Sequence, residues 1–278
     1  MLSPVLRPAA LLLPVLLVNL GTFVWPVLSL ASLSFRPVSA SGALGEGWSA
    51  ATWSNVLGDS FYLELVGHSV LVALVITLAT LLTSYPVALF VHRAAPRWRN
   101  LLLVLCVSPL LISAVVRTYG WLVILGDRGV LPSMLRSVGI APGRLMFNET
   151  GVMIGLTEIL MPYMILALLA GFGRLDATLE DAAASLGAPP WTRFRRIVLP
   201  LTGPGILLGC LLAFVLAVSS FITPKLLGGG RVNLLATEIY DQAIVTLNWP
   251  VAAALSVVVL AVFGAALLVY GRLLRVVA

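Results

Sequence analysis

The chain has 278 residues, of which 60% are hydrophobic and 10% are charged, and its formal net charge is +6. Soluble domains carry roughly 25% charged residues, so this composition excludes an ordinary soluble enzyme or binding domain. A membrane-spanning helix needs about 20 mostly apolar residues, and the length accommodates six of them with their loops. The arginines flank apolar runs, which favours cytoplasmic loops over nucleic-acid binding. We expect a single transmembrane domain over residues 1–278, surrounded by membrane lipid.

Six apolar runs, bounded by charges, Pro and Gly, predict the membrane spans. They are Ala9 to Leu33, Leu63 to Val91, Leu101 to Leu125, Val152 to Phe172, Leu201 to Pro224 and Pro250 to Tyr270. The first run is too long for the apolar core of a secretory signal, so we interpret it as an uncleaved helix. Pro109 and Pro162 lie inside runs and predict kinks. The predicted fold is therefore all-α and polytopic, with six transmembrane helices.

The placement of arginines predicts the orientation, because positive residues in short loops tend to remain in the cytoplasm. The densest basic segment is 92–99, which contains Arg93, Arg97 and Arg99. With this segment inside, the N-terminus, the loop 173–200 and the C-terminal tail are also cytoplasmic. Arg117 falls at the opposite end of the third span and is counted with the outer loops.

The loop 173–200 is the longest polar stretch on the predicted cytoplasmic side. Thr178 is suited to cap a short helix, with Asp181 three residues later in the manner of a capping box. Gly187 suits the left-handed position after the end of this helix. A second short helix is expected to start at Pro190 and to end at about Val198. The loop is thus predicted to be a compact helix-turn-helix.

One pattern in this loop is specific. The triplet Asp181, Ala182 and Ala183 is followed after three residues by Gly187, and after nine more by Ile197, Leu199 and Pro200. This pattern resembles the cytoplasmic coupling loop of binding-protein-dependent ABC importer permeases. Asp181 replaces the glutamate of the family pattern. Because Glu180 immediately precedes it, either carboxylate is a candidate for the contact that the family makes there.

The resemblance implies a permease of the type I ABC importer class in the bacterial inner membrane. Its implied partners are a second permease subunit, two ATPase subunits and an extracytoplasmic substrate-binding protein, which would meet the outer loops Phe35 to Tyr62 and Lys225 to Trp249. The residues expected to couple to the ATPase are Glu180, Asp181, Ala182, Ala183 and Gly187. The chain itself is expected to have no catalytic site and to bind no cofactor, since ATP and Mg belong to the ATPase.

Two further stretches suggest a class of solute. The segment Val116 to Leu131 and the segment from Leu199 to Gln242 resemble the permeases of spermidine and putrescine importers and their relatives. This resemblance implies a small amine as the solute. Relatives of these permeases also carry aminobutyrate, opines or aminophosphonates, so all of these remain open as substrates.

Four residues are candidates for the substrate path. Glu158 lies in the fourth span, where a carboxylate is costly and usually faces a cavity or a partner. It is either a cation contact on the path or a paired carboxylate that fixes helices together. Ser219, Ser220 and Phe221 lie in the fifth span, where they either line the path or serve helix packing, because serine also bonds to its own helix backbone.

Other features have simpler interpretations. Gly151 with Gly155, and Gly205 with Gly209, have the G-x-x-x-G spacing that permits close helix packing. His68 and His92 lack companion ligands at metal spacing, so no metal site is predicted. The alternative function is an ion-gradient-driven secondary transporter with Glu158 as its coupling carboxylate, and a non-transporting membrane scaffold is a third possibility. Neither of them needs a coupling loop.

Overall fold

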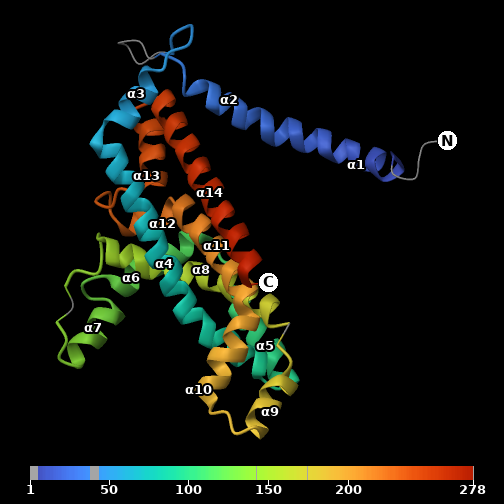
Figure 1. Ribbon diagram of the computed structural model, residues 1–278. Helices are drawn as coiled ribbons and strands as arrows, with labels where there is room; N and C mark the ends of the chain where they lie inside the picture. The colour runs from blue at the N-terminus through green and yellow to red at the C-terminus, as the bar shows by residue number, and fades with distance from the viewer. Residues whose placement is uncertain (1–5, 38–43, 142, 174, 278) are drawn as a thin grey trace. The chain divides into compact units, whose positions relative to one another are not determined.

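The computed structural model describes residues 6–37, 44–141, 143–173 and 175–277, most of which are helical (Figure 1). The helices are α1 (Leu6–Asn19), η1 (Leu20–Val24), α2 (Trp25–Leu33), α3 (Ala51–Gly58), α4 (Ser60–Arg93), α5 (Pro96–Val107), η2 (Ser108–Leu111), α6 (Ala114–Leu125), α7 (Val130–Ser137), α8 (Glu149–Phe172), α9 (Ala177–Ser185), α10 (Pro190–Arg193), η3 (Phe194–Val198), α11 (Leu199–Ser219), α12 (Ile222–Leu227), α13 (Leu235–Tyr240), η4 (Asp241–Val245) and α14 (Trp249–Val277). They form two units. The first comprises the described residues of 1–63 with 238–260, and the second those of 64–237 with 261–278.

Within the described ranges, five continuous helical stretches are long and apolar enough to cross a membrane. They are Leu13–Leu33, Ser60–Arg93, Glu149–Phe172, Pro190–Ser219 and Trp249–Val276. Two further helical segments, Pro96–Leu111 and Ala114–Ser137, are long and apolar enough only when taken together, and they are bent by 97° at their break. The described residues therefore contain five spans, or six if this bent pair forms one broken span. The expected all-helical, polytopic fold is confirmed. The expected run from Leu101 to Leu125 is interrupted near Pro109, where a kink was predicted, but the 97° bend divides the run into separate helices.

The break in the third span has a local cause. Pro109 lies in η2, a short 3₁₀ turn that closes α5, and the next residue after this turn, Ile112, is extended with ψ of 131°. Ser113 then caps a new helix, because its hydroxyl accepts a hydrogen bond from the N–H of Val115 at 3.3 Å. A serine N-cap directly after a 3₁₀ turn starts a helix in a new direction, so the proline does more than bend one helix.

In the first unit, the helical stretch Leu13–Leu33 has no buried residue. Packing begins at its end, where the indole N–H of Trp53 in α3 donates to the hydroxyl of Ser34 at 3.0 Å. The ring of Phe35 lies against those of Trp48 and Trp53, with centroids 6.1 and 5.9 Å apart. The segment from Phe35 to Tyr62, expected as an outer loop, therefore contains the helix α3 and an aromatic cluster.

The second unit is built on the packing of α8 against α11. A Cβ atom placed on Gly171 would lie 2.6 Å from the Cα of Gly205, so the two backbones touch there. One turn further along, a Cβ atom on Gly209 would meet the sulfur of Met164 at 2.4 Å. The expected packing role of Gly205 and Gly209 is confirmed, since only glycine fits this approach.

The other glycine pair has two separate roles. A Cβ atom on Gly155 would lie 3.1 Å from the side chain of Leu227 in α12, so Gly155 does serve helix packing. A Cβ atom on Gly151 would instead meet the carbonyl oxygen of Leu145 at 2.2 Å. The absence of a side chain at Gly151 therefore allows the preceding loop to pack against the start of α8. The prediction of a helix-packing role for Gly151 is wrong.

The fifth span also differs from its expected bounds of Leu201 to Pro224. It begins earlier, because α10, η3 and α11 form one continuous helical stretch from Pro190 to Ser219. It ends earlier, because Ser220 is extended with ψ of 124° and a short helix, α12, follows. The hydroxyls of Thr118 in α6 and Thr223 in α12 are 3.0 Å apart and join these two helices.

Candidate functional site

The cytoplasmic loop begins with a cap on α9. The carboxylate of Asp176 accepts a hydrogen bond from the N–H of Thr178 at 2.9 Å. This bond, together with one from the side chain of Thr178, holds the pKa of Asp176 below its ordinary value. The prediction that Thr178 is the cap is wrong. Asp176 is the better cap because its charge also favours the positive end of the helix dipole. Arg174, which begins the predicted polar segment, lies outside the described residues.

The turn after α9 forms as the sequence predicts. Gly187 has φ of +79°, in the left-handed region. The N–H of Ala188 donates to the carbonyl of Ala183 at 3.0 Å, and that of Gly187 to the carbonyl of Ala184 at 2.9 Å. These two bonds are the Schellman motif, which satisfies the last carbonyls of the helix. The backbone alone therefore fixes the turn.

The second helix of the loop starts at Pro190 as expected, but it does not end at Val198. It passes through the π-helical segment η3 into α11 without a break. Pro200 has no N–H to donate to the carbonyl four residues earlier, and the wider turn of η3 accommodates that loss. Figure 1 shows α9 and α10 side by side. We call Asp176 to Arg193 the coupling hairpin.

The predicted coupling residues lie together on this hairpin but have different surroundings. The carboxylate of Glu180 forms an ion pair of 2.8 Å with Arg93 at the end of α4. Asp181 is exposed and has no ion pair with a described residue, and Ala182 beside it is also exposed. Ala183 is half-buried. The neighbouring apolar side chain of Leu186 is 88% exposed.

An aromatic cluster links the coupling hairpin to the spans. Trp191 in α10 stacks on Phe194 at 5.6 Å, and Phe194 meets the ring of Tyr85 in α4 edge-on at 5.9 Å. The ring of Tyr85 also meets Phe172 at the end of α8, at 5.6 Å. Its hydroxyl lies 3.0 Å from that of Thr202 in α11. Sequence reasoning missed this cluster, because nothing in the local pattern distinguishes Tyr85 from other residues of an apolar helix.

A charged cavity of about 400 Å³ lies beside the hairpin. It is lined by His92, Arg93, Leu175, Glu180, Asp181 and Arg193. The Nδ1 atom of His92 and the Nε atom of Arg193 are buried and have no hydrogen-bond partner among the described residues. Buried polar atoms are normally paired, so this cavity presents groups that a partner protein or water would satisfy.

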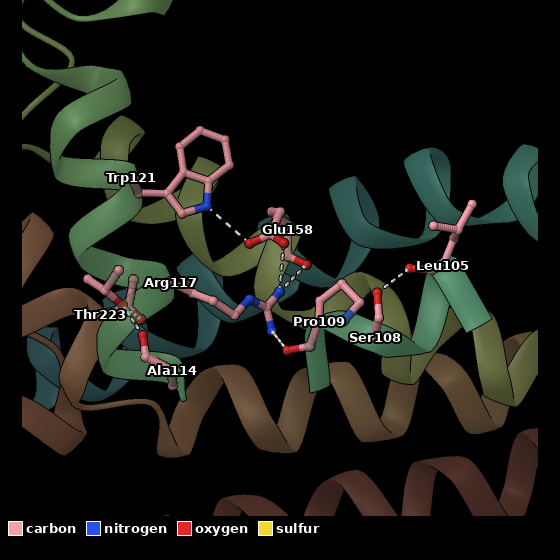
Figure 2. Close-up of polar contacts among 9 residues, drawn as sticks. Leu105, Ser108, Pro109, Ala114, Arg117, Trp121, Glu158 and Thr223 are labelled. Atoms are coloured by element: carbon pink, nitrogen blue, oxygen red, sulfur yellow. Dashed lines mark hydrogen bonds and ion pairs between the residues drawn. The ribbon is translucent and has the colours of Figure 1, made fainter. Parts of the chain in front are cut away.

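A second polar cluster lies at the bend between α5 and α6. One oxygen of Glu158 in α8 forms an ion pair of 2.7 Å with the guanidinium of Arg117 in α6. The other oxygen accepts a hydrogen bond from the indole N–H of Trp121 at 3.0 Å. Figure 2 shows the carboxylate between these two donors. Charged residues within membrane spans are rare and are usually paired, as this one is.

Arg117 was expected at the outer end of its span, among the loop arginines, and that placement is wrong. Its side chain is only 9% exposed and lies within α6, against α8. The ion pair could have been predicted from the sequence, because each of the two charged residues is isolated within an apolar run. A lone arginine in one apolar run and a lone glutamate in another each need a partner, and each is the obvious candidate for the other.

The remaining path candidates surround the end of α11. Ser219 is the last residue of α11, Ser220 is the extended residue after it, and Phe221 precedes α12. The hydroxyl of Ser219 donates to the carbonyl of Val215 in its own helix at 2.9 Å. The three residues thus mark a helix break inside the predicted fifth span.

The described residues contain no group of three or more His, Cys, Asp or Glu side chains that could hold a metal ion. The imidazole Nε2 of His68 lies 2.9 Å from a carboxylate oxygen of Glu149, a contact between α4 and α8. Neither polar cluster has the nucleophile, base and orienting group of a catalytic site.

Comparison with known proteins gives consistent results. Residues 85–275 match the family described as the binding-protein-dependent transport system inner membrane component. The spermidine/putrescine transport system permease protein PotB of Haemophilus influenzae is 38% identical over 218 residues, which cover 78% of this chain and 76% of that protein. PotB of Escherichia coli is also 38% identical, over 219 residues that cover 78% and 80%.

A solved structure shares the fold. The chain resembles a subunit of a bacterial ABC transporter involved in the import of the acidic polysaccharide alginate, with a TM-score of 0.69. The match covers 98% of this chain and 94% of that one, at 16% sequence identity. At this identity the likeness concerns the arrangement of helices alone.

Proposed function

Because this chain belongs to the family of binding-protein-dependent transport system inner membrane components, and is thus an ABC importer permease, we propose that it forms a membrane path for polyamines such as putrescine or spermidine. The observation that carries the substrate class is the 38% identity to two proteins named spermidine/putrescine permeases, over more than three quarters of the chain. Aminobutyrate, opines and aminophosphonates are the substrates that the test has to exclude.

In this proposal the coupling hairpin docks on a separate ATPase, which supplies ATP and Mg. The exposed Asp181 and Leu186 offer the partner one charge and one apolar contact. The unpaired polar atoms of His92 and Arg193 in the adjoining cavity favour the same surface. Two ATPase subunits would serve this chain and a second permease subunit, since one chain with six spans has too few helices to enclose a path alone.

The proposed solute path includes Glu158, Ser219, Ser220 and Phe221. An ammonium group is recognised by a carboxylate, by hydroxyl oxygens and by the face of an aromatic ring, and these residues offer all three. The side chain of Glu158 is 36% exposed within its own chain, so part of it is accessible to a solute or to the second permease.

We place the N- and C-termini in the cytoplasm and the chain in the bacterial inner membrane. The ion pair between Arg93 and Glu180 supports this orientation, because it puts the basic segment 92–99 and the coupling hairpin on one side. An extracytoplasmic binding protein would then deliver the solute to the opposite side. A cysteine introduced at Arg97 should react with an impermeant probe only in inverted vesicles, and reaction in intact cells would reverse the orientation.

The test is reconstitution of the complete complex in liposomes with its binding protein. ATP hydrolysis and solute uptake are measured with putrescine, spermidine, aminobutyrate or no solute. We expect polyamines to stimulate both activities and aminobutyrate to stimulate neither. Stimulation by aminobutyrate alone would show that aminobutyrate, and not a polyamine, is the substrate. Failure of any ATPase to assemble with this chain would contradict the coupling role.

Family membership favours this function over an ion-gradient carrier. The distinguishing measurement is uptake without ATP under an imposed proton or sodium gradient. Uptake under those conditions would support the carrier, with Glu158 as its coupling carboxylate, whereas we expect none.

A further inference from the structure

The guanidinium of Arg117 donates to two backbone carbonyls in addition to the carboxylate of Glu158. Besides the carboxylate of Glu158, Nη2 donates to the backbone carbonyl of that residue at 3.1 Å. Nη1 makes a longer contact of 3.5 Å with the carbonyl of Pro109. Figure 2 shows these acceptors around the one guanidinium. Arg117 is therefore held by the backbone of two other segments, independently of the carboxylate.

The backbone carbonyl of Glu158 is available because of a proline. Pro162 lies four residues later in α8, and its ring nitrogen has no hydrogen to donate to that carbonyl. The carbonyl of Pro109 accepts the N–H of Ile112 at 3.1 Å, the bond that closes η2, and its second lone pair faces the guanidinium. These acceptors belong to the fold and remain in place whatever the carboxylate of Glu158 binds.

The two partners of the ion pair are not equally covered. The side chain of Arg117 is 9% exposed, whereas that of Glu158 is 36% exposed. A cavity of about 430 Å³ adjoins the guanidinium and is lined by residues 110–114 with Ile159 and Tyr163. Glu158 is thus the more exposed partner, and the guanidinium of Arg117 has space beside it in which to move.

An unpaired carboxylate at membrane depth is costly, so Glu158 needs a cation at every stage of transport. From this geometry we propose that Arg117 is a tethered cation that occupies the ammonium site of Glu158 between transport events. An ammonium group of the solute exchanges with it, while the guanidinium stays on the two backbone carbonyls. This inference rests on the proposed function, because it assumes a cationic amine as the solute.

The exchange makes Arg117 a specificity determinant. A neutral solute cannot replace the positive charge that Glu158 loses, and a zwitterion such as aminobutyrate brings a second carboxylate to the same place. A polyamine supplies the required charge with none of the opposite sign. Competition with the guanidinium therefore selects for polycations, at a cost in apparent affinity for every amine.

A purely structural role predicts a different result. If the pair only holds α6 against α8, its loss lowers the amount of active complex and hence the maximal rate, but leaves KM unchanged. If Arg117 competes with the solute, its replacement lowers KM. The sign of the change in KM separates the two roles, because damage to a site raises KM or leaves it unchanged.

The experiment measures the kinetics of putrescine and spermidine uptake by the reconstituted complex at pH 8. We expect Arg117→Gln to lower KM about fivefold, as removal of a partly exposed ion-pair competitor should. Arg117→Lys keeps the charge without the forked contact. Its KM should lie between that of Arg117→Gln and that of the wild type. Glu158→Gln should raise KM, and adding Arg117→Gln to it should have no further effect on KM, since the two residues act as one unit.

Thr223→Val is the matched control. It removes a hydrogen bond to α6 without altering charge, and should leave KM at the wild-type value. An unchanged or raised KM in Arg117→Gln, with wild-type uptake intact, would overturn the inference. If Arg117→Gln does not assemble, a KM for Arg117→Lys equal to that of the wild type would overturn it equally. Absence of polyamine uptake by the wild-type complex would contradict the proposed function instead.

Discussion

The coupling hairpin and the bend between α5 and α6 are stabilised in opposite ways. The hairpin is exposed and is shaped by backbone bonds within a few residues, around Asp176 and Gly187. The bend is packed and is held by side chains from helices 41 residues apart in sequence, through Arg117 and Glu158. A partner can therefore push the hairpin as a unit without unfolding it, whereas the bend keeps its shape only while α6 and α8 stay in register.

The largest effect is expected at the turn of the hairpin. Gly187→Val should reduce ATPase stimulation and transport by about fivefold or more, because a β-branched residue at φ of +79° costs about 1–3 kcal/mol. No atom lies within 4 Å of the added Cβ, so backbone conformation alone is at issue. Co-purification with the ATPase measures docking. Gly187→Asn is the control, since asparagine tolerates this region, and equal behaviour of both variants would contradict the explanation.

The second effect concerns the bend. Arg117→Ala should lower the free energy of unfolding by about 2–4 kcal/mol, because it leaves the carboxylate of Glu158 with the N–H of Trp121 but no cation, and the proline-freed carbonyl without a donor. Thermal unfolding of the purified complex in detergent measures it. Arg128→Ala, at an exposed arginine near the end of the same helix, should change the unfolding temperature little. Similar shifts for the two variants would show that the cluster does not stabilise the bend.

A smaller effect is expected where the hairpin meets α4. The side chains of Arg93 and Glu180 are 50% and 19% exposed, so their pair contributes about 0.2–1 kcal/mol. Arg93→Gln should roughly halve ATPase stimulation at low salt, and less at high salt, where exposed charges are screened. Exchange of the two residues, by Arg93→Glu with Glu180→Arg, should restore activity. Failure of the exchange to restore it would mean that another property of Arg93 matters.

The smallest expected effect is a dependence of the stability of α9 on pH. The folded-state pKa of Asp176 is lowered by its bonds to Thr178, so the cap stabilises α9 above the unfolded pKa of about 3.9. This stabilisation is lost as the pH falls through the lower folded value. Hydrogen exchange of residues 177–180, corrected for intrinsic rates, should speed up below about pH 4. Asp176→Asn retains the cap and should abolish this dependence, and a persistent dependence would assign it to another carboxylate.

The sequence predicted the hairpin better than the bend because local rules decide only the first. A glycine followed by two prolines specifies where a helix stops, so the turn at Gly187 was predictable. The cap was not, since Asp176 and Thr178 are both good caps two residues apart. The continuation of the second helix through Pro200 depends on the wider π turn, which no residue pattern in the sequence predicts.

The bend required information that a single run of residues does not contain. Pro109 predicts a kink, but the 97° change of direction also needs Ser113 as a new cap. The isolated charges Arg117 and Glu158 each indicate a missing partner, yet only the packing of α6 on α8 shows that they supply one another. Tyr85 gave no signal at all, because its role depends on two rings, those of Phe172 and Phe194, that come from other segments.

The continuity of Pro190 to Ser219 makes this stretch a lever between the two sides of the membrane. Its backbone touches that of α8 at Gly205, about 22 Å from Pro190 and about 21 Å from Ser219 at a rise of 1.5 Å per residue. Because Gly205 is near the middle of the stretch, a tilt about this residue moves both ends by similar distances in opposite directions. If the stretch moves as one rigid body, a displacement of α10 by a bound partner would move Ser219 by a similar distance in the opposite direction.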